Sequence, residues 1–334
     1  MRKVVDSSRP PGTAAGRASL RRAVPALVPL LPWLLGVLTL PRTATPQEHP
    51  ALHPSEGAGL RFSWQVHEGK FWQIAHGSPG EPPATTDARE GTRGQCPPGM
   101  VDVRGRMKSD SGDWFGIDGL QQLTCRRWIN REFPERCAEY DRDSWLARSA
   151  ELPTKTMHFC VDRFEYPNRK GVYPIVLVDW NEASGLCGRE GKRLCTEDEW
   201  TFACEGEEAQ PYPNGYARED VCVNDRVWRE FKHFGRRRDD EVTMRELDRL
   251  WQGEPSGSRP RCRSPFGVYD MTGNIDEWTR SSRHGERPSV LKGGYWGPVR
   301  TRCRPATRAH GETHSFYQQG LRCCADARTE APGG

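Results

Sequence analysis

The chain contains 334 residues, 35% of them hydrophobic and 12 of them tryptophan, which is enough apolar material to build a sizeable core. This composition excludes a wholly disordered chain. The net charge is only +4, from 49 Lys and Arg against 45 Asp and Glu, and nucleic-acid binders usually carry a larger basic excess, so the composition argues against nucleic-acid binding. The 34 glycines and 27 prolines favour a turn-rich fold of short elements over a helical bundle.

Residues 1–45 have the pattern of an export signal. Several arginines precede an uncharged stretch over residues 23–40, which is the order found in secretory signal peptides. Prolines within that stretch weaken a membrane-spanning helix and favour cleavage, whereas Arg42 disturbs the expected cleavage motif and keeps an uncleaved membrane anchor as the alternative. In both cases we predict an exported protein that is periplasmic, envelope-associated or secreted.

The 12 cysteines fit an oxidising compartment. All of them follow residue 95, and an even set spread over one domain is most simply a disulfide framework. None occurs as Cys-x-x-Cys, so a zinc ribbon or a thioredoxin-like site has no local support.

Two regions follow the export signal. Residues 46–93 are rich in Pro, Gly, Glu, Thr and His and are predicted to form a linker. Within them, the aromatic stretch LRFSWQVHEGKFWQIAH alternates in a way that suits a hairpin. The main domain is predicted to span residues 94–328.

Local patterns place several elements in the main domain. The β-branched run VYPIVLVDW predicts a buried strand. Two helices follow it, because Asp179 and Glu182 in DWNEASGLCGREG, and Thr196 and Glu199 in TEDEWTFACEG, have the spacing of capping boxes. The short segment KRLC between these helices is predicted to be a turn.

Residues 226–253 form a charge-rich insertion in which EVTMRELDRLWQ predicts one exposed helix. Three consecutive arginines over residues 236–238 allow two interpretations. They could grip an acidic partner, or they could form a solvated face that the acidic residues 239–241 neutralise, and the second is the commoner arrangement.

Four segments, taken in order, resemble one family. They are VDWNEASGLCGREGKRLCTEDEWTFACEG, FGVYDMTGNIDEWT, LKGGYW and QQGLRCCAD, and together they are similar to the sulfatase-modifying-factor domain of formylglycine-generating enzymes. The resemblance covers residues 96–326. It implies an α+β domain of modified C-type-lectin-like topology, low in regular secondary structure and linked by disulfides. Members of this family include sulfoxide synthases and pigment-maturation enzymes, so the fold alone does not fix a reaction.

The resemblance also implies calcium. In YDMTGNIDEW, the carboxylates of Asp270 and Glu277 flank a Gly-Asn turn that can offer the carbonyls of Gly273 and Ile275, and this all-oxygen mixture suits a hard cation. The alternative is that Asp270 caps a turn while Glu277 is merely exposed.

A second calcium site of the family would fall on Asn224 and Asp225 in CVNDRVW. The long insertion follows directly and obscures any further ligands. This second site is therefore the weaker of the two expectations.

The resemblance further implies two disulfides. Relatives join the cysteine at the end of the first helix to that of the C-terminal Gly-aromatic-Arg-Cys, which gives Cys187–Cys323 here. They join the cysteine of the second helix to that of an Arg-x-Arg-Cys strand, which gives Cys204–Cys303. Cys324 is the main competitor of Cys323 for its partner.

One feature of the active enzymes is missing. Formylglycine generators carry two redox cysteines between the Lys-Gly-Gly turn and the Arg-x-Arg-Cys, and these hold Cu(I). The corresponding segment here, YWGPVRTR, has no cysteine. If Cys303 is aligned instead with the second redox cysteine, Pro298 takes the place of the first. Either alignment predicts that formylglycine oxidase chemistry is lost.

The segment after Gly294 supplies the residues that shape the substrate groove in the family. They are predicted to bind a peptide, protein or small-molecule ligand, and they are Tyr295, Trp296, Arg300, Arg308, His310, His314, Phe316 and Tyr317. Packing in the core would explain Trp296 and Phe316 equally well.

An alternative function is a metal-dependent oxidoreductase or protein-modifying enzyme of the same family that uses His310 and His314. Their spacing of four would place both rings on one face of a helix, but Gly311 and the surrounding turn residues disfavour a helix there. A transition metal therefore has no further support from the sequence.

Overall fold

The structure, a computed structural model, describes residues 60–75, 95–109, 116–129, 136–235 and 238–328. All of these lie in one packing unit. The segment over residues 1–45, interpreted above as a signal or anchor, lies outside the described residues. Within the part of the chain that is described, no helix combines the length and apolar character needed to cross a bilayer.

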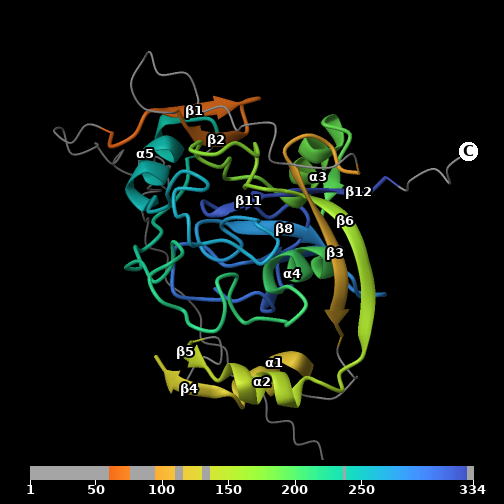
Figure 1. Cartoon of the computed structure of the whole chain (residues 1–334). Coiled ribbons are helices and arrows are strands. Elements are labelled where there is room, and N and C mark those ends of the chain that lie inside the picture. The colour runs from red at the N-terminus through yellow and green to blue at the C-terminus, as the bar shows by residue number, and fades with distance from the viewer. Residues whose placement is uncertain (1–59, 76–94, 110–115, 130–135, 236–237, 329–334) are drawn as a thin grey trace, which may run out of the picture. The chain divides into compact units, whose positions relative to one another are not determined.

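Two four-stranded sheets organise the fold (Figure 1). The first has the order β3 (Met100–Lys108), β6 (Thr154–Asp162), β12 (Cys323–Asp326) and β7 (Arg193–Leu194), and all of its neighbours are antiparallel. The second has the order β10 (Ala306–Thr307), β9 (Ser289–Lys292), β8 (Asp276–Arg280) and β11 (Gln319–Leu321), with β11 parallel to β8. Two separate pairs are β1 (Trp64–His67) with β2 (Phe71–Ile74), and β4 (Cys125–Trp128) with β5 (Cys137–Tyr140).

Short helices cover these strands. They are α1 (Gly116–Gln122), α2 (Arg142–Arg148), α3 (Trp180–Arg189), α4 (Glu197–Glu205) and α5 (Glu241–Leu250). The predicted α+β fold of short elements is confirmed. Both capping boxes are present as well: Asp179 and Glu182 begin α3, and Thr196 and Glu199 begin α4.

The core centres on α4, which lies against the long β3–β6 ladder (Figure 1). Trp200 and Phe202 are fully buried there among apolar side chains of both strands, including Val103 and Phe159. This helix is buried on nearly all sides, so its disulfide to the C-terminal part of the chain lies in the interior.

The predicted strand over residues 172–180 is wrong. Its side chains from Ile175 to Val178 are buried, but each backbone group finds a different partner. The N–H of Ile175 donates to Tyr166, Val176 forms an isolated bridge with Trp72, and Val178 reaches β11. Leu177 also has a left-handed φ of 63°, which interrupts an extended run. The run of β-branched and apolar residues therefore reflects the burial of these side chains and not a β-strand.

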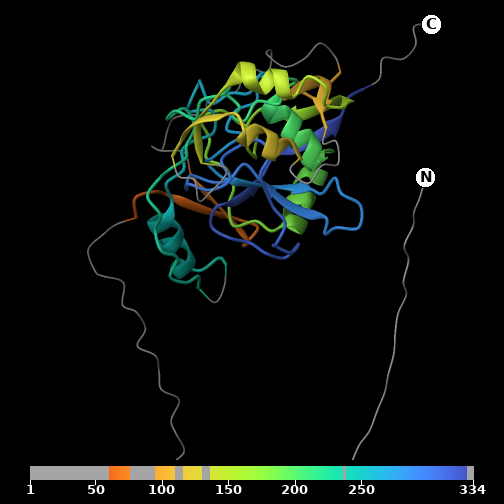
Figure 2. The same cartoon turned by 90° about the horizontal axis from the view of Figure 1, so that it is seen from below.

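The aromatic stretch before residue 76 contains the β1–β2 pair, which lies beside α5 in both views (Figures 1 and 2). The indole of Trp64 donates to Asp248 of α5 at 3.0 Å, and the indole of Trp72 donates to the carbonyl of Arg238 at 2.5 Å. Residues 60–75 thus contact the insertion directly.

Candidate functional site

All 12 cysteines lie within the described residues, and they form six disulfides that leave none free. Both bonds implied by the resemblance are present, Cys187–Cys323 with a Cα–Cα distance of 5.6 Å and Cys204–Cys303 with one of 5.5 Å. The remaining bonds are Cys96–Cys160, Cys125–Cys137, Cys195–Cys324 and Cys222–Cys262.

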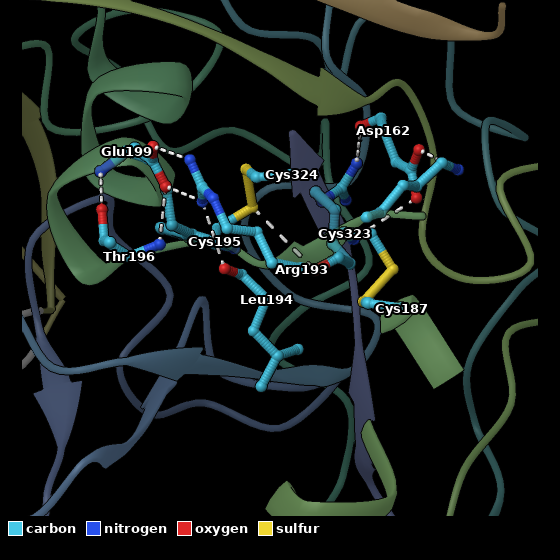
Figure 3. Close-up of a disulfide and its surroundings, with 12 residues drawn as sticks. Asp162, Cys187, Arg193, Leu194, Cys195, Thr196, Glu199, Cys323 and Cys324 are labelled. Atoms are coloured by element: carbon cyan, nitrogen blue, oxygen red, sulfur yellow. Dashed lines mark hydrogen bonds and ion pairs between the residues drawn. A yellow bond between two sulfur atoms is a disulfide. The ribbon is translucent and has the colours of Figure 1, made fainter. Parts of the chain in front are cut away.

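The two adjacent cysteines of β12 bond in opposite directions (Figure 3). Cys323 reaches Cys187 of α3, while Cys324 reaches Cys195 at the end of β7, so the two do not compete for one partner. Beside them, Arg193 makes two ion-pair contacts of 2.7 Å to Glu199 of α4. The last strand is therefore fastened on both of its sides.

The shortened segment between Gly294 and Cys303 contains no thiol chemistry. Cys303 is fully buried, is bonded to Cys204, and donates its N–H to the carbonyl of Pro211. The segment is organised by Arg300, which adopts a left-handed φ of 54° and pairs with buried Asp276 at 2.6 Å. A buried ion pair therefore anchors this segment.

Glu277, one of the expected calcium ligands, is 1% exposed, so the alternative that it is merely exposed is wrong. Arg322 donates to both of its oxygens, at 2.8 and 3.0 Å, and the indole of Trp200 donates at 2.7 Å. A carboxylate offers about four lone-pair positions, so these three donors leave room for one further contact.

The second expected ligand, Asp270, is also buried, and its Oδ2 accepts the N–H of Gly257 at 2.6 Å. Burial raises the pKa of Asp270 to about 7. The sequence reasoning missed Glu165, which binds Ser256 and Asn274 through Oε2 while its buried Oε1 has no hydrogen-bond partner. Burial, then the charges of Asp270 and Glu277, raise the pKa of Glu165 well above its usual value.

The charges in this interior fit a cation. Three buried carboxyl groups, those of Glu165, Asp270 and Glu277, lie in this interior, where Arg322 pairs with Glu277 and Oε1 of Glu165 has no hydrogen-bond partner. A bound cation would hold the groups of raised pKa in their ionised form. The described residues contain no group of three or more His, Cys, Asp or Glu side chains arranged to hold a metal. A calcium ion here would thus rely on Asp270, Glu277 and main-chain carbonyls.

The second calcium site, at Asn224 and Asp225, does not fit a cation. Arg218, whose side chain is 3% exposed, donates to both oxygens of Asp225 at 2.7 and 3.0 Å, and Arg136 lies 3.5 Å away. Two guanidinium groups therefore already neutralise the carboxylate that a calcium ion would need.

The aromatic residues predicted to line a ligand groove are largely covered. Trp296 is 2% and Tyr317 is 4% exposed, and Phe316 and Tyr295 pack partly buried against the same cluster. The covering residues come from the insertion: Phe231 lies 4.9 Å from Phe316, ring centre to ring centre, and Trp251 lies 4.7 Å from Trp296. The structure therefore places Trp296 in the core.

Of the polar groove residues, His314 lies beside this cluster, 6.1 Å from Phe316 between ring centres. Arg308 pairs with Glu197 and contacts Glu286 at 3.3 Å. The rings of His310 and His314 stack at 4.0 Å with 7° between their planes. Since imidazole lone pairs lie in the ring plane, two stacked rings do not converge on one metal ion. Burial lowers the pKa of both histidines, and the charge of the second imidazole and of nearby arginines lowers that of His310 further.

The comparison with known families agrees with this geometry. Residues 128–327, more than half of the chain, match the sulfatase-modifying factor enzyme 1-like domain. The chain therefore belongs to the sulfatase-modifying-factor family.

Individual relatives are similar over part of their length. The chain is 32% identical over 177 residues to the inactive C-alpha-formylglycine-generating enzyme 2 of Mus musculus, covering 46% of this chain and 49% of the relative. It is 27% identical over 186 residues to the formylglycine-generating enzyme of Bos taurus, covering 46% and 44%. The chain thus spans about half the length of the curated relatives it matches.

Solved structures that resemble the fold include PvdO from Pseudomonas aeruginosa, with a TM-score of 0.40, 17% identity and coverage of 68% of this chain and 94% of that one. CarF has a TM-score of 0.39 at 13% identity, covering 67% and 98%.

Proposed function

We propose that this chain is an exported, calcium-stabilised binding domain of its family that does not oxidise cysteine to formylglycine. The observation that carries the proposal is the state of Cys303. It is buried and bonded to Cys204, and the segment from Gly294 to Cys303 offers no pair of thiolates. A soft copper ion needs such a pair, and a single thiol cannot resolve a mixed disulfide.

Two further observations support a binding role. Arginine and aromatic side chains gather in the groove segment, and these residue types commonly anchor recognition surfaces. A relative of 32% identity carries the word inactive in its name. The ligand would be a peptide, protein or small molecule contacting the half-buried face of Arg300, His310, His314 and Phe316.

Calcium would stabilise the domain rather than act on a ligand. Asp270 and Glu277, with the carbonyls of Gly273 and Ile275, would hold the ion. The buried Oε1 of Glu165 without a partner, and the repulsion by Asp270 and Glu277 that helps raise the pKa of Glu165, support this assignment. Bound calcium supplies positive charge to a buried acidic interior and so favours the native state. Export is supported by the six disulfides, which persist in oxidising compartments.

The proposal is tested by offering a Cys-x-Pro-x-Arg peptide to the intact protein with Cu(I), oxygen and a thiol reductant. We expect no mass change at the peptide cysteine. Cys303→Ala is the matched variant, because formylglycine that forms with the native chain and disappears in this variant would overturn the proposal. A known formylglycine generator in the same mixture shows that the assay works.

A further inference from the structure

The insertion covers the aromatic face of the domain with a piece of chain that has no regular secondary structure. We define the aromatic face as Tyr295, Trp296, Phe316 and Tyr317, and the strap as residues 226–235. The strap contains no helix or strand. Its first residue donates a backbone hydrogen bond to the carbonyl of Trp296 at 2.8 Å, which is the kind of main-chain contact by which a bound peptide is held.

Two phenylalanines of the strap supply its contacts with that face. Phe231 lies 4.9 Å from Phe316 and is nearly parallel to Tyr317, at 6.3 Å and 12°. Phe234 meets the same Phe316 edge-on at 6.0 Å. These rings, three residues apart in a segment without helix or strand, thus engage one shared ring of the aromatic face.

The strap is fastened less firmly than the core beneath it. Val227 and Trp228 are 80% and 62% exposed, and Phe231 and Phe234 are only partly buried. No disulfide begins within the insertion. Instead, Cys222–Cys262 joins the two chain segments that flank it, with a Cα–Cα distance of 4.9 Å. The strap can therefore leave the face while the buried part of the insertion at Leu250 and Trp251 stays packed and its base stays covalently closed.

The strap also makes side-chain and backbone contacts with α5 and the residues around it. Lys232 donates its N–H to Glu246 at 2.8 Å, and Arg229 donates to the carbonyl of Arg249 at 2.6 Å. Each such hydrogen bond contributes modestly to stability in water. These contacts are ones that a competing peptide could replace.

We propose that the aromatic face is a docking surface for an extended peptide with two aromatic side chains three residues apart, and that the strap occupies it as an internal stand-in for that peptide. This inference rests on the proposed binding function and names its ligand class. An external peptide then competes with the strap. The apparent dissociation constant of the peptide equals its intrinsic dissociation constant divided by the fraction of molecules in which the strap is released.

The experiment uses the full chain and a synthetic peptide with the strap sequence RVWREFKHFG. The variant Phe231→Ala/Phe234→Ala removes both anchors of the strap. We expect this variant to bind the peptide at least about tenfold more tightly than the native chain does, by fluorescence anisotropy. The same peptide with both phenylalanines replaced by alanine should bind neither protein. Val227→Ala/Trp228→Ala is the matched control, because it changes exposed strap residues and should behave like the native chain.

Backbone hydrogen exchange gives a second readout. Exchange at Arg226, whose N–H donates to the carbonyl of Trp296, should rise in the anchor variant. The proposal is overturned if the anchor variant keeps all six disulfides and melts cooperatively yet neither binds the peptide nor exchanges faster. It is equally overturned if the double variant and Phe231→Ala alone both fail to form the six disulfides, since the strap is then an obligate part of the core.

The two proposals fail separately. Loss of the peptide-binding result leaves the absence of formylglycine chemistry intact. Formylglycine formation by the native chain would reject the proposed function whatever the strap does.

Discussion

The C-terminal strand β12 and the insertion are both buried against the domain, but different forces hold them. β12 carries two disulfides and is preceded by Arg322, whose guanidinium is fully buried and paired to Glu277. The insertion is held by ring contacts and hydrogen bonds, and the disulfide Cys222–Cys262 joins the two segments that flank it. Covalent links therefore fasten the C-terminal strand, whereas ring contacts and hydrogen bonds hold the strap over the aromatic face, which is the segment that we propose a peptide can replace.

The largest loss of unfolding free energy is expected when a disulfide of β12 is removed. Replacing Cys187 and Cys323 with alanine opens a loop with a sequence separation of 136 residues. The chain-entropy model gives a loss of about 5 kcal/mol of unfolding free energy. The same replacement at Cys125 and Cys137, separated by 12 residues, should cost about 3 kcal/mol. Urea denaturation measures both, and equal losses would contradict this difference between the bridges.

The ion pair next to β12 should come second. Arg322→Met leaves the carboxylate of Glu277 buried without its partner, which costs about 3–5 kcal/mol. The exposed pair of Arg126 and Asp141 is the control, since Arg126→Met should change stability by about 1 kcal/mol or less. Comparable losses in the two variants, measured by denaturant titration, would show that burial of the Arg322 pair has no special role.

Calcium should contribute an intermediate amount. At a free calcium concentration one hundred times the dissociation constant, binding adds about 2.7 kcal/mol, so chelation should lower the melting temperature by several degrees. Asp270→Ala should melt at one temperature with and without chelator. If the melting temperature of the native chain is the same with and without chelator, calcium does not stabilise the domain.

A smaller, local effect is expected where the N-terminal hairpin meets α5. Asp248 accepts the N–H groups of Arg61 and Phe62 and the indole of Trp64, each at 3.0 Å. Asp248→Ala should cost about 1–3 kcal/mol because it strands these donors. Hydrogen exchange should rise in α5 and the strap but not in β12. Glu241→Ala, at the exposed start of α5, is the control and should leave exchange unchanged.

The smallest effect is the pH dependence of stability that arises from His310 and His314. The folded pKa values of His310 and His314 lie below the unfolded value of about 6.5, so the native state takes up fewer protons. Their contribution to the stability of the native state is therefore fully present above pH 6.5 and is lost as the pH falls below about 6.5 through the lower folded pKa values. Protection factors of residues 308–317, which correct for the base-catalysed intrinsic exchange rate, should be lower at pH 5 than at pH 7.5. His314→Phe keeps an aromatic ring in the stack but removes one titrating imidazole, so it should weaken this pH dependence. An unchanged pH dependence would show that other groups cause it.

The sequence predicted the elements that rest on local chemistry or on the family resemblance. Both capping boxes were readable because the N-cap and N3 residues lie three apart in the chain. The bonds Cys187–Cys323 and Cys204–Cys303 came from the resemblance, since spacing alone cannot choose among many connectivities. The α+β fold class came from the same source.

What could not be predicted depends on contacts between distant segments. The segment KRLC was predicted as a turn, yet β7 forms within it because Arg193 and Leu194 lie opposite β12. The run over residues 172–180 looked like a strand because its side chains are buried, although its backbone partners come from several segments.

The candidate site shows the same limit. The sequence around Asp225 does not predict that Arg136 is its neighbour. Glu165 is separated by more than a hundred residues from the loop that it faces, so its place in the acidic interior was visible only in the structure. Cover of the aromatic face by Phe231 likewise depends on how the insertion folds back.

The central claim is that Cys303 is structural and that the domain has no redox thiol. The most direct measurement alkylates the native, unreduced protein with a thiol probe, digests it, and maps disulfide-linked peptides by mass spectrometry. We predict a peptide pair joining Cys204 to Cys303 and no label on Cys303. A labelled Cys303 in protein that melts cooperatively would contradict the account and return this cysteine to the list of reactive groups.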